Sequence, residues 1–229
     1  MPMRAKGRRP LACHHEAGHA LARWYFGHST DRAVVLTVEE VLGGNKVENR
    51  RGVLIQCEGL VDAYDIIGWP FGPLKIEGSA ERQAEFNRLR AIDRDIDLIN
   101  CMAGLYAEAA YRRCTVDACM MAGGGGDMER LQTILDAWGM NEGESAEVSR
   151  EAERRAAALV RSPMGATAVK AIAGALFRQG EVEGDEIASL CREAYGGRVC
   201  AYGAWTDHWP PTLAQLRAGF IPERPAKAA

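Results

Sequence analysis

The segment H-E-A-G-H at residues 15–19 constrains this chain more than any other part of it. Pro10 suits the first turn of a helix and Gly27 suits the position just past its end, so the flanking residues predict a helix over residues 10–27. Residues four apart on a helix lie on one face, which places His15 and His19 side by side with their Cβ atoms about 6 Å apart. The remaining elements must therefore pack around a helix that carries this pair.

Two imidazoles placed in this way can bind one zinc ion, and the H-E-x-x-H pattern is typical of zinc peptidases. Zinc lowers the pKa of a bound water to about 7 and polarises a carbonyl group. Glu16 lies beside the histidine face, so its carboxylate can take a proton from that water and pass it to a leaving amine. His14 points about 100° away from His15, and we expect it not to be a ligand. The alternative interpretation is that the histidines are ordinary core or surface residues.

A catalytic zinc site usually has three protein ligands and one open position. The extended pattern H-E-x-x-H-x-x-G-x-x-H is excluded, because the chain has Ala22 and Tyr25 where that pattern needs glycine and histidine. A thermolysin-like glutamate would lie on a second helix, whereas the glutamates about 20 residues past His19 follow a strand-like run. The candidates for the third ligand are Glu39, Glu40, His28 and Asp127. Asp127 stands between a glycine run and a helix, where an aspartate is ordinarily an N-cap.

The rest of the sequence predicts a mainly α (α+β) fold with a small β-hairpin; because the H-E-x-x-H helix resembles that of the zincins, the resemblance implies a helical zincin-like metallopeptidase domain. The runs at residues 33–38 and 52–57 are predicted strands, with Gly43-Gly44 in the long loop of the hairpin. Helical patterns predict further helices at residues 79–113, 127–138, 145–161, 167–179 and 184–195. Ser162-Pro163 is expected to end the helix before it, and residues 68–73 are expected to form a loop.

Composition excludes several classes of function. The 229 residues carry a net charge of −3, which argues against nucleic acid or a membrane surface as the partner of the whole chain. No run of about 18 apolar residues predicts a transmembrane helix, and the N-terminal basic residues lack the apolar segment of a signal peptide. Residues 1–10 are expected to form a disordered basic arm. The seven cysteines include no C-x-x-C pair, so we expect reduced, mostly buried thiols in a cytoplasmic protein rather than a cysteine zinc cluster.

Four further segments occur in the order in which one known family has them. They are A-G-L-Y-A-E at residues 103–108, G-D-M-E-R at 126–130, A-W-G-M at 137–140, and the stretch from I-A-G-A-L at 172–176 to G-D-E-I at 184–187. Together with H-E-A-G-H-A-L they resemble the protease domain of the FtsH-type ATP-dependent zinc metallopeptidases. The resemblance implies that His15, His19 and Asp127 bind zinc. It also implies that Glu16 is the general base.

The same resemblance places Glu108 where it could orient a ligand through a hydrogen bond. An ordinary helix-surface carboxylate explains this residue equally well. The similarity covers roughly residues 11–195, with an unmatched insert at about 39–99 and a C-terminal extension at 196–229. The chain contains no G-x-x-x-x-G-K-[ST] pattern, so we expect neither the family's ATPase module nor its membrane-anchoring helices within these residues.

Two functions follow as expectations. The first is a zinc-dependent endopeptidase that acts on unfolded or flexible polypeptides, because no unfoldase accompanies the site. The family's hexameric ring is in doubt, which leaves a homo-oligomer or a separate ATPase partner open. The second is a non-hydrolytic zinc-binding module that regulates a separate partner or serves as its adaptor, although the intact Glu16 argues against it. The aromatic residues of Trp69-Pro70-Phe71, Trp205 and Trp209 either pack against the domain or form a platform for a substrate or partner.

Overall fold

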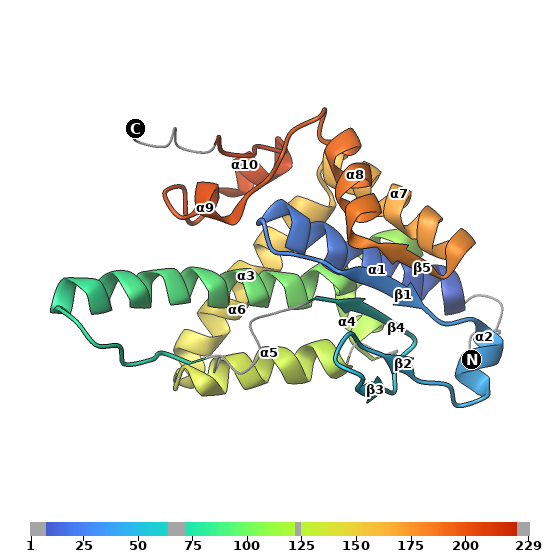
Figure 1. Ribbon diagram of the computed structural model, residues 1–229, viewed down its shortest axis with the longest axis horizontal. Coiled ribbons are helices and arrows are strands. Elements are labelled where there is room, and N and C mark those ends of the chain that lie inside the picture. The colour runs from blue at the N-terminus through green and yellow to red at the C-terminus, as the bar shows by residue number, and fades with distance from the viewer. Residues whose placement is uncertain (1–7, 64–71, 122–124, 224–229) are drawn as a thin grey trace.

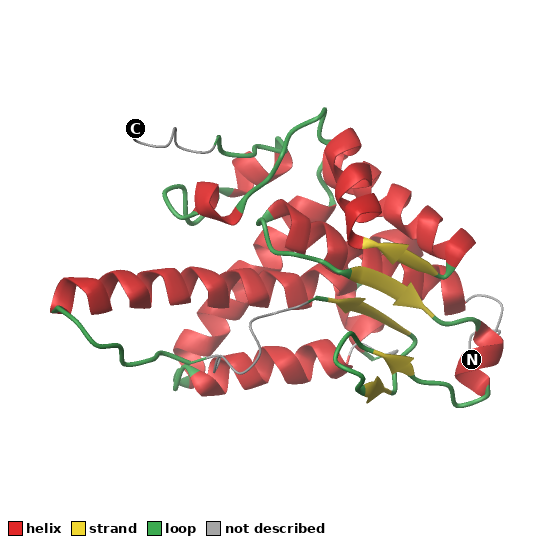
Figure 2. Cartoon of the chain, viewed as in Figure 1, coloured by secondary structure: helices red, strands yellow, loops and turns green. Residues whose placement is uncertain are grey.

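The computed structural model describes residues 8–63, 72–121 and 125–223. The predicted mainly α (α+β) fold is confirmed, because 63% of the chain is helical and 7% is strand. Figure 2 shows the strands gathered in one part of a molecule that is otherwise built from helices. The predicted basic arm and the aromatic loop lie largely outside the described residues, except that residues 8–10 already belong to the first helix.

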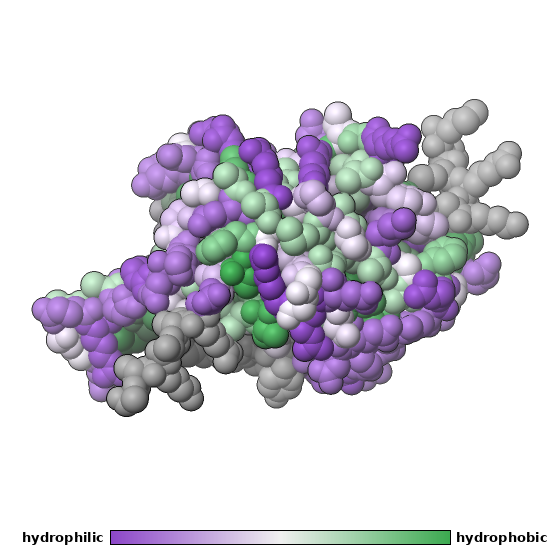
Figure 3. Space-filling model, turned by 90° about the horizontal axis from the view of Figure 1, so that it is seen from above, coloured by the Kyte–Doolittle hydropathy of each residue, from purple (hydrophilic) through white to green (hydrophobic). Residues whose placement is uncertain are grey.

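Six helices of more than ten residues form the body of the described chain (Figure 1). They are α1 (Arg8–Tyr25), α3 (Ala80–Arg112), α5 (Gly125–Ala137), α6 (Glu142–Val160), α7 (Pro163–Gln179) and α8 (Gly184–Ala194). The shorter helices are α2 (Val38–Leu42), α4 (Val116–Met120), α9 (Tyr202–Trp205) and α10 (Leu213–Arg217). None of the described helices combines the length and the apolar character needed to cross a membrane. On the face shown in Figure 3, apolar residues form patches among hydrophilic ones.

Capping residues explain where the long helices begin. Ser79 accepts a hydrogen bond from the backbone at the start of α3, as the predicted boundary requires. Asn141 forms a capping box with Glu144, so α6 begins three residues earlier than predicted. Ser162 caps α7 and Pro163 occupies its first turn. The same two residues that end one helix therefore begin the next, and α7 starts before the predicted residue 167.

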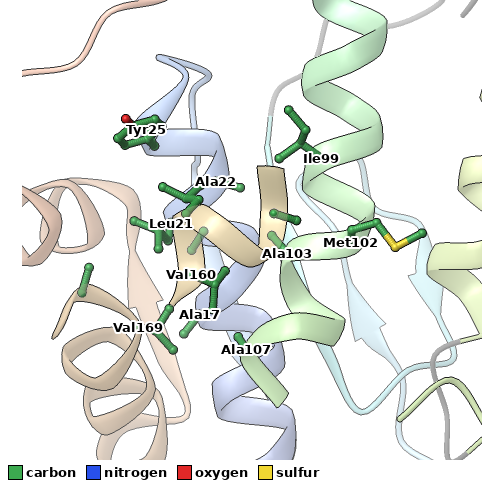
Figure 4. Packing of buried hydrophobic residues seen from close by; sticks show 14 of the residues in the cluster. Ala17, Leu21, Ala22, Tyr25, Ile99, Met102, Ala103, Ala107, Val160 and Val169 are labelled. Carbon is green, nitrogen blue, oxygen red and sulfur yellow. The ribbon is translucent and has the colours of Figure 1, made fainter. Parts of the chain in front are cut away.

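The core forms where α1 packs between α3 and α7 (Figure 4). Small residues allow the backbones of α1 and α3 to approach closely. A Cβ atom on Gly18 would lie 2.4 Å from the carbonyl oxygen of Ala103 and 2.8 Å from the Cβ of Ala107. Leu21 and Ala22 continue this buried face of α1. The histidine helix is thus fixed along its length by core packing.

The structure has a small antiparallel β element, as predicted, but the predicted pairing of residues 33–38 with residues 52–57 is wrong. The observed three-stranded antiparallel sheet has the order β4-β1-β5, with β1 at Arg32–Val35, β4 at Gly59–Asp62 and β5 at Glu181–Glu183. Val34 of β1 is paired with Leu60 of β4, and Ala33 of β1 is paired with Val182 of β5. Strand β3 (Leu54–Ile55) instead pairs with β2 (Val47–Glu48) in a separate two-stranded sheet.

A local helix signal explains this difference. Thr37 and Glu40 form a capping box that begins α2, so strand β1 ends at Val35 and the chain becomes helical at Val38. The second apolar run ends in a bend, and the residues that follow it supply β4. The insert predicted at residues 39–99 therefore contributes a strand to the sheet beside α1, as well as the first half of α3.

The C-terminal extension packs against the end of α1. Trp205 is fully buried, and its indole nitrogen donates a hydrogen bond to the carbonyl oxygen of Tyr25 at 2.8 Å. Trp209 donates from its indole nitrogen to Asp95 at 3.2 Å. Packing is therefore confirmed for these two tryptophans, which anchor the extension to α1 and α3.

Candidate metal centre

The three residues implied as ligands lie together. His15 and His19 share one face of α1, and their Nε2 atoms are 3.1 Å apart. Asp127 lies in the first turn of α5 and places its two carboxylate oxygens 2.9 Å from the Nε2 atom of His15 and 3.4 Å from that of His19. Around a tetrahedral zinc ion with ligands at about 2.0–2.1 Å, neighbouring ligand atoms are about 3.3 Å apart. The observed separations match this value, so the group could hold a metal ion.

Hydrogen bonds on the far side of each ring orient the two imidazoles. The Nδ1 atom of His19 donates to the backbone oxygen of Asn100 at 2.8 Å, because a carbonyl can only accept. The Nδ1 atom of His15 lies 3.3 Å from a carboxylate oxygen of Glu108. Both supporting groups belong to α3. With the proton on Nδ1, each Nε2 atom has a free lone pair directed at the point between His15, His19 and Asp127. This is the tautomer that a metal ligand needs.

The site has a strongly negative environment that favours a cation. Burial alone lowers the pKa of His15, but its hydrogen bonds with Asp127 and Glu108 outweigh burial and raise this pKa to about 10. Burial raises the pKa of Asp127, and the nearby His19 and His15 reverse this and hold it well below its usual range. Burial likewise raises the pKa of Glu108, which His15 and Arg112 lower overall. Asp127, which faces the Nε2 atom of His15, could hold a metal ion in place of the proton on that atom, while Glu108 keeps its contact with Nδ1.

Glu16 is buried between α1 and the sheet. Its side chain lies against β4, where a Cβ atom on Gly59 would be only 2.7 Å from its Cγ atom. Burial raises the pKa of the Glu16 carboxyl, while His15 and His19 oppose the rise and the backbone N–H of Val61 donates a hydrogen bond that opposes it further. A buried carboxyl with a raised pKa beside a metal position is suited to accept a proton and pass it on.

The ligands are partly open to solvent. The side chains of His15 and Asp127 are 17% and 19% exposed, whereas that of His19 is 9% exposed. A water or a substrate group can therefore reach the side of the site that is formed by His15 and Asp127. In the part of the chain that the structure describes, no fourth histidine, cysteine, aspartate or glutamate joins the group, which would leave one position of a bound metal for water or substrate, as a catalytic site requires.

The other histidine and glutamate candidates lie elsewhere. His14 stacks on Tyr111 with ring centroids 3.9 Å apart, and its Nδ1 atom pairs with the carbonyl oxygen of Pro10. Glu39 and Glu40 belong to α2, where Glu40 caps the helix. Among the described residues, neither of these glutamates nor His28 joins the group of His15, His19 and Asp127. All seven cysteines are free thiols, as expected.

Sequence reasoning missed two residues of α3 that complete the site. Asn100 contributes only its backbone oxygen, which no sequence signal marks. Gly104 lies directly beside the imidazoles, since a Cβ atom there would be 2.4 Å from the Nε2 atom of His19 and 2.9 Å from that of His15. A glycine in the interior of a long helix costs about 1 kcal/mol relative to alanine, and this cost is a signal that could have identified it.

The chain matches no protein-family model and gives no significant match among curated proteins. The resemblance to FtsH-type peptidases therefore remains an expectation based on the motifs.

Proposed function

We propose that this protein is a zinc-dependent endopeptidase. The observation that carries the proposal is the convergence of His15, His19 and Asp127 on one point, with the buried carboxyl of Glu16 beside them. Two imidazoles, one carboxylate and an open position form a ligand set typical of catalytic zinc. The same set also suits non-haem iron, so the metal must be identified directly. The adjacent Glu16 favours a hydrolytic zinc site over an iron site, because zinc-dependent hydrolysis needs a general base.

When bound, zinc would lower the pKa of a water and polarise the carbonyl of the scissile bond. Glu16 takes the proton of the attacking water and passes it to the departing amine, and its raised pKa makes it a stronger proton acceptor than an ordinary glutamate. Asn100 and Glu108 hold the rings of His19 and His15 in place throughout. These roles need no movement of α1, which the core fixes.

The position of strand β4 is evidence that the substrate is a polypeptide. It forms one edge of the described three-stranded sheet, and the N–H group of Val61 on this strand reaches Glu16. An extended peptide could pair with such an edge through backbone hydrogen bonds and bring a peptide bond next to the metal position. Folded substrates do not offer an extended backbone, so we infer that the substrate is an unfolded or flexible polypeptide.

The decisive test compares Glu16→Gln with the wild type, using zinc-quantified protein and an unfolded protein as substrate. We expect both to bind one zinc per chain and the variant to lose hydrolysis by about 100- to 10,000-fold, the usual contribution of a general base. Glu129→Gln, which changes an exposed carboxylate of α5, is the matched control and should keep full activity. His19→Ala should lose the metal as well.

The alternative is a non-hydrolytic zinc module that regulates a separate partner or serves as its adaptor. It predicts that Glu16→Gln retains both zinc and the biological effect of the protein. Hydrolysis by the wild type alone, without an added ATPase or an oligomer, would favour the endopeptidase. The endopeptidase proposal would be rejected if the wild type bound zinc without hydrolysing the substrate and Glu16→Gln kept the biological effect.

A further inference from the structure

Two thiols lie in contact behind the candidate metal centre. Arg113 ends α3 in the left-handed conformation with φ 55°, and Thr115 caps the short helix α4 that follows. This tight turn folds α4 back on the end of α3, so that the sulfur atoms of Cys114 and Cys119 are 3.5 Å apart. Cys114 is half-buried, whereas Cys119 is fully buried. A disulfide requires a separation of about 2.05 Å, so closing the pair needs a movement of only about 1.5 Å.

A chain of contacts connects this pair to the histidines. The Nη1 atom of Arg112 lies 3.9 Å from the sulfur of Cys119 and donates a hydrogen bond to Glu108 at 2.9 Å. The other carboxylate oxygen of Glu108 lies 3.3 Å from the Nδ1 atom of His15. Arg112 thus interacts at once with a thiol sulfur and with the carboxylate that orients His15. A change at the sulfur alters what Arg112 can donate to Glu108.

We propose that Cys114 and Cys119 form a redox-active pair that closes to a disulfide by exchange with a small-molecule disulfide of the glutathione type. Closure weakens metal binding by His15, to which the pair is connected through Arg112 and Glu108. Disulfides that form in proteins of reducing compartments are usually transient and serve catalysis or redox sensing. The connection to His15 rests on the metal site proposed above, whereas disulfide formation does not.

The exchange is balanced with two protein thiols and one external disulfide. The accessible Cys114, as its thiolate, attacks the external disulfide, breaks its S–S bond and releases one small thiol. The buried Cys119 then loses its proton and attacks the sulfur of Cys114, which releases the second small thiol and forms the protein disulfide. The two cysteines are oxidised, the external disulfide is reduced, and the protons of the cysteines pass to the released thiols.

The effect on the metal site has a defined direction. Closure moves the sulfur of Cys119 toward Cys114 and turns it into a disulfide sulfur, and we infer that this weakens its 3.9 Å contact with Arg112. Arg112 then pairs more strongly with Glu108, which leaves this carboxylate a poorer acceptor for His15. A ligand whose supporting hydrogen bond weakens binds its metal less tightly, and loss of such a partner typically costs 10- to 100-fold in affinity. Because Glu108 is retained, we expect an increase in the zinc dissociation constant of about tenfold.

The test equilibrates the full chain in glutathione buffers of increasing oxidation and counts free thiols by alkylation and peptide mass mapping. The expected result is the loss of two thiols, mapped to a Cys114–Cys119 disulfide. The double variant Cys114→Ser/Cys119→Ser should lose none in this peptide, and Cys191→Ala, which changes a buried thiol of α8, should behave as the wild type. Stable glutathione adducts at Cys114, or thiols that stay reduced, would overturn the proposal.

Zinc affinity is then measured by competition with a chelating dye in the reduced and oxidised proteins. An increase in the dissociation constant on oxidation of the wild type, absent in the double variant, supports the connection to His15. An unchanged constant overturns that connection, and loss of a metal ion in the double variant overturns the redox role in favour of a thiolate metal site. If no form binds zinc, the proposed function fails, while the thiol count still decides disulfide formation. In that case the NMR chemical shifts of the His15 ring nitrogens are compared in the reduced and oxidised metal-free protein. Unchanged shifts would overturn the connection to His15.

Discussion

Replacing Gly104 by alanine should abolish tight metal binding without changing a ligand. The added Cβ atom would lie 2.4 Å from the Nε2 atom of His19, whereas ordinary contact begins at 3.4 Å, so the ring must move by about 1 Å. Its hydrogen bond to Asn100 opposes that movement. Metal–ligand distances tolerate only about 0.2 Å, so the displacement is several times too large. Loss of a supporting residue costs 10- to 100-fold in affinity, and moving the ligand itself should cost at least about 100-fold.

The fold should tolerate this change. Alanine gains up to about 1 kcal/mol over glycine in a helix interior, and overpacking costs about 1–3 kcal/mol. The free energy of unfolding of metal-free Gly104→Ala should therefore lie within about 2 kcal/mol of the wild type. Chemical unfolding of the metal-free proteins measures this quantity, and competition with a chelating dye measures the zinc dissociation constant.

Two other glycines separate the effect on the site from general effects on packing. Gly18→Ala would press its Cβ atom on the backbone oxygen of Ala103 at 2.4 Å, so it should destabilise the contact between α1 and α3. Gly174→Ala meets only the flexible end of Arg178, at 3.3 Å, and should be harmless. Wild-type zinc affinity in Gly104→Ala would refute the placement of the metal beside this glycine. Equal loss of stability in the Gly104 and Gly18 variants would refute the distinction between the two sites.

Three further predictions follow from the same geometry. Gly59→Ala should lower hydrolysis while the zinc content stays at the wild-type level, because the added Cβ atom would displace Glu16. Metal content and activity measured on one sample check this, and unchanged activity would contradict it. Zinc uptake near neutral pH should release about one proton, because metal-free His15 has a pKa of about 10 and must lose its proton to bind the ion. Apparent affinity should therefore rise with pH until about 10; calorimetry in buffers of different ionisation enthalpy counts the proton. Metal removal should leave the helical circular dichroism signal intact, since α1 is held by core packing, and a chelator-induced loss of helix would contradict this.

The long helices could be predicted because their signals are local. Ser79 and Gly27 mark ends that the structure confirms. Strand pairing could not be predicted in the same way, since β1 pairs with β5 across almost 150 residues of sequence. One local signal does bear on the first predicted strand. The sequence T-V-E-E at residues 37–40 has the S/T-x-x-E pattern of a capping box, and it excludes a strand that continues to residue 38.

The candidate ligands also divide into those with a local sequence signal and those that depend on long-range packing. His15 and His19 could be recognised because their side chains carry the chemistry and their spacing is fixed by one helix. Asp127 is more than 100 residues away, and its local sequence fits an N-cap equally well. Only the packing of α3 against α1 and α5 decides its role, by bringing the start of α5 to the histidine face.

The supports of the site show why this packing matters for function. Asn100 acts through a carbonyl oxygen, which every residue has, and Gly104 acts through the absence of a side chain. Both lie on α3, whose distance from α1 is set by Gly18 in the core. The close approach that buries the apolar faces of the two helices thus also aims the imidazoles and leaves room for the ion between them. Core packing and metal binding consequently depend on one interface, and substitutions that widen it should weaken the metal site even where no ligand is changed.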